Sequence, residues 1–86
     1  MSIKDLIIQF SNGATKGNAS NKRVRIEGNK LINYNTIIAI RNNDGTIQLN
    51  NRKYSRTTSK LQGTIRLYAN VTSEFYGEDA TIYYAW

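Results

Sequence analysis

The alternation of apolar and polar residues predicts two β-hairpins in the middle of the chain. Residues 24–27 and 30–34 flank Gly28-Asn29, and residues 36–41 and 46–49 flank a second short segment, which reads Asn-Asn-Asp-Gly. Asn, Asp and Gly accept the positive φ that tight hairpin turns require, and the flanking segments are rich in β-branched residues. The pattern therefore predicts four antiparallel strands, with Arg23 and Arg25 on the outer face of the first hairpin.

The segment from residue 56 to residue 70 decides the fold class. At 100° per residue, one arc collects Thr57, Leu61, Thr64, Ile65 and Tyr68, while Arg56, Lys60 and Arg66 lie away from it. This arrangement favours an amphipathic helix with a basic outer face, for which Ser55 or Thr57 is the candidate N-cap. The alternative is a strand in which residues 65, 67, 69 and 71 share one face. We rank the helix above the strand.

The two ends of the chain are less clearly patterned. In residues 3–10, Leu6, Ile8 and Phe10 alternate, which favours a strand, but Ile3, Leu6, Ile7 and Phe10 also fit a helical stripe. Residues 11–21 are mostly small and polar and predict a loop. Residues 81–86 have the β-branched and aromatic content of a closing strand, with Glu74, Glu78 and Asp79 in the turn before it.

The predicted fold class is α+β in a single domain of residues 1–86. We expect a small twisted antiparallel sheet of about four to five strands with one helix packed on it.

The charge is distributed unevenly along the chain. Residues 1–73 hold all 12 Lys and Arg residues against three carboxylates, a net charge of +9, whereas residues 74–86 hold three carboxylates and no cation. A basic body attracts polyanions through counterion release and steering. The plainer interpretation is that a small protein needs net charge to stay dissolved, and for the charge alone we weigh the two equally.

The composition argues against several classes of function. The chain has no Cys and no His, which removes disulfides, thiolate nucleophiles, most zinc and haem sites and the commonest general base. Its longest apolar run is Leu6-Ile7-Ile8, far short of a membrane helix. We expect a protein of the cytoplasm with no enzymatic activity, no cofactor, no metal and no membrane contact.

The segment Tyr54–Gln62 crowds hydroxyls, two cations and an amide around the expected start of the helix. A helix N-terminus has unpaired N–H groups and partial positive charge, so such a segment caps the helix, binds a phosphate, or does both. Capping is the commoner role and ranks first. The segment 12–17 is similar in composition to a phosphate loop but lacks its spacing, and Glu78 and Asp79 would point to opposite faces of a strand.

Three motifs together resemble those of a known family. They are residues 10–17 (Phe-Ser-Asn-Gly-Ala-Thr-Lys-Gly), residues 19–21 (Ala-Ser-Asn) and residues 54–60 (Tyr-Ser-Arg-Thr-Thr-Ser-Lys). The chain is similar to a small domain of unknown function from phage and mobile-element proteins of low-GC Gram-positive bacteria. Gly28, Leu31 and Tyr34 match the middle element, so the resemblance spans residues 10–62. The family usually has a His before the final Gln, where this chain has Leu61-Gln62. The resemblance implies an origin and no activity.

These observations predict a small basic binding protein whose partner is nucleic acid or a nucleoprotein complex. Tyr54 is the candidate stacking ring, and the candidate phosphate contacts are Lys22, Arg23, Arg25, Arg52, Lys53, Arg56 and Lys60. The alternative is a phage-encoded inhibitor of a host defence protein, such as an anti-CRISPR, acting through its acidic aromatic tail. A third is a structural part of a phage assembly. We expect a monomer or small homo-oligomer.

Overall fold

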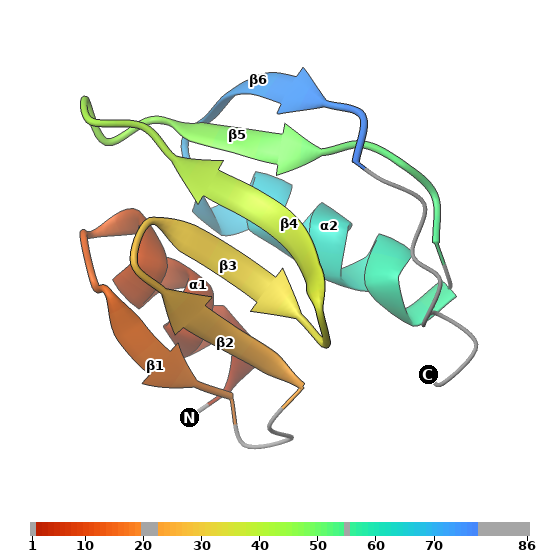
Figure 1. The fold of residues 1–86 in the computed structure, drawn as a ribbon, viewed down its shortest axis with the longest axis horizontal. Helices are drawn as coiled ribbons and strands as arrows, with labels where there is room; N and C mark the ends of the chain where they lie inside the picture. Colours follow the sequence, from red (N-terminus) through yellow and green to blue (C-terminus); the bar gives the residue numbers. More distant parts are fainter. Residues whose placement is uncertain (1, 20–22, 55, 78–86) are drawn as a thin grey trace.

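The computed structural model describes residues 2–19, 23–54 and 56–77. Within these segments the chain forms two helices and six strands (Figure 1). In chain order they are α1 (Ile3–Ser11), β1 (Lys16–Asn18), β2 (Val24–Glu27), β3 (Lys30–Asn33), β4 (Thr36–Arg41), β5 (Ile47–Asn50), α2 (Arg56–Tyr68) and β6 (Val71–Phe75). Neither helix is long and apolar enough to span a bilayer.

The six strands lie in the sheet in the same order as in the chain. Strands β1 to β5 are antiparallel neighbours, whereas β6 runs parallel to β5 because α2 returns the chain before β6 begins. Figure 1 shows α1 and α2 on the same face of the sheet. The predicted α+β class is therefore confirmed, with six strands and two helices in place of four to five strands and one helix.

Both predicted hairpins are present. Glu27 pairs with Lys30 across the first turn, where Gly28 has φ +63°, and β4 pairs with β5 beyond a turn in which Gly45 has φ +89°. Glycine adopts these angles without the steric cost that a Cβ brings. The short polar turns thus locate the hairpins as the sequence pattern predicted.

The strand prediction for residues 3–10 is wrong, because this segment forms α1. Leu6, Ile7 and Phe10, spaced along one helical face, are fully buried. The hydroxyl oxygen of Ser2 accepts a hydrogen bond from the Asp5 backbone N–H at 3.2 Å and caps the helix. The capping residue and the helical stripe outweigh the alternation of residues 6, 8 and 10.

Two further predictions need correction at the edges of the sheet. The expected loop of residues 11–21 contains β1, in which a Cβ added to Gly17 would lie 2.9 Å from Leu6 Cδ1. Glu74, expected in a turn, lies in β6. The predicted closing strand of residues 81–86, with Glu78 and Asp79, lies outside the described residues.

Helix α2 is confirmed, and a strand through residues 65–71 is excluded. Its buried positions are Thr58, Leu61, Gln62 and Ile65. The predicted apolar arc is therefore correct at Leu61 and Ile65, whereas Thr57 and Tyr68 are exposed. Thr57 lies inside the helix and is not its N-cap, and residue 55 lies outside the described segments. The apolar positions of α2 pack with those of α1 against the sheet to form the core.

Candidate nucleic-acid interface

One end of the sheet brings together segments that are far apart in the sequence. Residue 24 pairs with residue 33, and residue 33 pairs with residue 36, so β2 begins where β3 ends and β4 begins. Strand β5 ends there too, because its last residue, Asn50, donates to the carbonyl of Ile37, the second residue of β4. The loop from β5 and the start of α2 follow (Figure 1). We call this part of the molecule the basic end: it comprises the start of β2, the end of β3, the start of β4, the loop after β5 and the first turns of α2.

A fully buried asparagine organises the basic end. The Asn50 side chain is 0 % exposed and its Nδ2 donates to the Ile37 carbonyl and to the Tyr54 hydroxyl, both at 2.9 Å. Its Oδ1 accepts from the backbone N–H groups of Arg52 and Gly77, both at 3.0 Å. One amide therefore joins β4, the loop after β5 and the chain beyond β6.

Helix α2 is joined to the same loop by a buried glutamine. Gln62 Nε2 donates to the backbone carbonyls of Asn50 at 2.6 Å and Arg52 at 2.9 Å. One turn earlier, Asn33 Nδ2 donates to the Thr58 hydroxyl at 3.3 Å, and both side chains are buried. The hydroxyl-rich segment therefore contributes Thr58 to the interior of the protein. These contacts support a structural role for the Thr58 hydroxyl.

The sequence pattern does not reveal the structural roles of Asn33, Asn50 and Gln62. Gln62 falls outside the apolar arc that the periodicity of residues 56–70 predicts, so its burial on the inner side of α2 could not be read from the sequence pattern. Buried amides of this kind are expected to be fully hydrogen-bonded, which Asn50 is.

Arg25, Arg52 and Tyr54 contact other parts of the protein. Arg25 is half-buried, pairs with Glu27 and donates to the backbone carbonyl of Tyr34. Arg52 Nη1 donates to the Gly77 carbonyl at 3.3 Å, and its guanidinium lies 4.9 Å from the centre of the Tyr76 ring. Tyr54 is half-buried against the core. These side chains therefore stabilise the structure of the basic end.

The remaining nominated cations are exposed. Lys53, Arg56 and Lys60 form no ion pair with any residue in the described part of the chain. Arg56 and Lys60 lie one turn apart on the outer side of α2. Arg23 is exposed immediately before β2, and Lys22 lies outside the described residues. Lys53, Arg56 and Lys60 can therefore reach a ligand from the loop after β5 and from α2.

None of the four carboxylates that the structure describes forms an ion pair with Lys53, Arg56 or Lys60. Asp5 is in the first turn of α1, Glu27 ends β2 at the opposite turn, and Glu74 pairs with Arg66 at 2.7 Å. Asp44 lies in the β4–β5 turn, where the hydroxyl and backbone N–H of Thr46 donate to its carboxylate and lower its pKa below the usual value.

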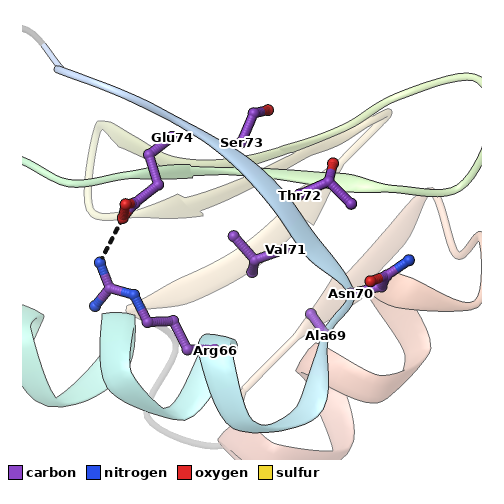
Figure 2. Close-up of a pocket in the computed structure, with 7 residues that line it drawn as sticks. All are labelled: Arg66, Ala69, Asn70, Val71, Thr72, Ser73 and Glu74. Atoms are coloured by element: carbon purple, nitrogen blue, oxygen red, sulfur yellow. Dashed lines mark hydrogen bonds and ion pairs between the residues drawn. The ribbon is translucent and has the colours of Figure 1, made fainter.

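Figure 2 shows a groove between the end of α2 and β6. Its volume is about 620 Å³, its lining runs from Arg66 and Ala69 to Glu74, and the Arg66–Glu74 ion pair crosses it. Both charged groups are satisfied by each other. In residues 2–19, 23–54 and 56–77, no three His, Cys, Asp or Glu side chains are grouped so that they could hold a metal ion.

The fold and this geometry define a small α+β protein with a basic end on a mostly antiparallel sheet. The chain belongs to a family of unknown function, DUF8033, whose model matches residues 9–79. No curated protein and no solved structure matches the chain.

Proposed function

We propose that this protein binds nucleic acid, alone or within a nucleoprotein complex, and performs no catalysis. The observation that carries the proposal is the convergence of Arg23, Lys53, Arg56 and Lys60 on the basic end from separate parts of the sequence. A cluster of exposed cations on one part of the surface is the electrostatic footprint of a phosphate-binding surface.

The proposal predicts binding that depends strongly on salt. Each phosphate neutralised releases counterions, and the magnitude of the slope of log K against log salt increases by about 0.9 per contact on duplex DNA. The double change Arg56→Ala and Lys60→Ala should therefore weaken binding to all sequences alike and reduce the slope by about 1 to 2. The fold should persist, because both side chains are exposed.

A second double variant provides a matched control. Lys16 and Lys30 are also exposed, but they lie in β1 and β3 near the opposite end of the sheet. Lys16→Ala with Lys30→Ala removes the same charge and should leave most of the affinity and the slope intact. If both double variants weaken binding equally in filter-binding titrations across salt, the effect is one of net charge and the basic end is not the site.

We further propose an origin in phage or mobile elements, which rests on the three sequence motifs. The alternative function, inhibition of a host defence protein, depends on an acidic aromatic tail that lies mostly outside the described residues. A pull-down from host lysate with and without nuclease separates the two. The inhibitor would be favoured by two results together: a partner that stays bound after nuclease treatment, and purified protein that binds no nucleic acid.

A further inference from the structure

The outermost line of α2 contains a glycine that the fold does not require. Arg56, Lys60, Gly63 and Leu67 follow one another at intervals of four, three and four residues, opposite the buried face of the helix. Gly63 has no positive φ, and no neighbouring atom lies within 4 Å of where its Cβ would be. Its position therefore imposes neither an unusual backbone angle nor a close internal contact.

A glycine in the middle of a helix reduces stability relative to alanine, because it has more conformational freedom to lose on folding. The other glycines with clear structural roles differ from Gly63: Gly28 and Gly45 have positive φ, and Gly17 packs against Leu6. A destabilising residue without a structural reason indicates a place where a partner approaches the backbone.

We propose that this line of α2 docks in the major groove of double-stranded DNA, with Gly63 at the point of closest approach. This inference rests on the proposed function and specifies its ligand. The groove is wide enough to admit one helix, and α2, with 13 residues, is roughly 20 Å long. No described element covers its outer face.

The chemistry of the line fits duplex DNA better than other nucleic acids. Arg56 and Lys60 are exposed cations at its N-terminal part, complementary to phosphates, and Leu67, 77 % exposed, offers an apolar group that suits thymine methyls. The line has no aromatic ring on which an unpaired base would stack, which disfavours single strands. The major groove of an RNA duplex is too narrow for side chains to read, which disfavours double-stranded RNA.

The decisive test compares Gly63→Ala with Gly63→Leu. Alanine and leucine are both good helix formers, so both variants should melt at a higher temperature than the parent. Only leucine adds enough bulk to hold the helix away from the bases. We expect Gly63→Leu to bind a 20-base-pair DNA duplex about tenfold more weakly, as for loss of a base contact, and Gly63→Ala to stay within about threefold of the parent.

Fluorescence anisotropy should be measured with the DNA duplex, the matching RNA duplex and one DNA strand. Tighter binding of the parent to duplex DNA together with selective loss in Gly63→Leu supports the inference. Equal affinity of Gly63→Leu and the parent for duplex DNA, or a preference for RNA or single strands, overturns it while leaving the proposed function standing. If the parent binds none of the three, the proposed function fails and this inference with it.

Discussion

The Asn50 side chain offers the sharpest test of how the basic end is held together. Asn50→Ala removes four hydrogen bonds, to the Ile37 carbonyl, the Tyr54 hydroxyl and the N–H groups of Arg52 and Gly77. The Gly77 N–H is buried, and leaving such a donor unpaired costs about 1–3 kcal/mol. The other three are partly buried, so water replaces some of their bonding and each loses roughly 0.5–1.5 kcal/mol.

The combined loss should be about 2.5–7.5 kcal/mol, a large part of the 5–15 kcal/mol that stabilises a typical domain. Urea denaturation followed by circular dichroism measures it, and amide hydrogen exchange at Gly77 should accelerate in parallel. Asn51→Ala is the matched control, because the neighbouring Asn51 is exposed and keeps its backbone bond to Phe75. If Asn50→Ala loses no more stability than Asn51→Ala, the network does not hold this end of the protein.

Three further predictions concern other parts of the chain. Gly77→Ala should destabilise the protein in thermal melts, because an added Cβ would overlap the fixed Asn50 amide; an unchanged melting temperature would contradict this. Thr46→Val should raise the Asp44 pKa in an NMR titration. Because the folded-state pKa of Asp44 is lowered, the contribution of this carboxylate to stability is present above the unfolded pKa and is lost as pH falls through the folded pKa. The variant should therefore lose less stability on acidification than the parent. An unchanged Asp44 pKa would refute this. Deleting residues 81–86 should abolish cooperative melting if they form a closing strand that buries aromatic side chains worth roughly 1.5–3 kcal/mol each; melting at the parent temperature would favour an exposed binding tail.

The parts of the fold that the sequence predicted are those specified by local chemistry. The two hairpins depend on Gly and Asn in their turns, and α2 depends on the spacing of Leu61 and Ile65, all of which are visible in short windows. The N-terminal segment was misassigned because its apolar residues satisfy both periods. The N-cap at Ser2 favours the helix over the strand, but the cap is recognisable only once Asp5 is known to lie in the first helical turn.

The missed strands depend on long-range contacts. Strand β1 is Lys-Gly-Asn, which has no strand-forming pattern and pairs with β2 because its glycine fits against Leu6. Strand β6 is largely polar and pairs in parallel with β5 only after α2 has reversed the chain. The nominated cations were identifiable individually, but the engagement of Arg25 and Arg52 by backbone carbonyls required the folded structure.

The match between strand order and chain order has a consequence for how the protein folds. Each pairing from β1 to β5 joins segments that are adjacent in sequence, so these contacts have low contact order and close short loops. Pairing of β6 with β5 instead requires the 20 intervening residues, 51–70, to be in place. We expect the five-strand meander to assemble first and β6 to join last. Because the bond from the Gly77 N–H to the Asn50 amide forms only once β6 has joined, this bond should contribute little to the folding rate and mainly slow unfolding.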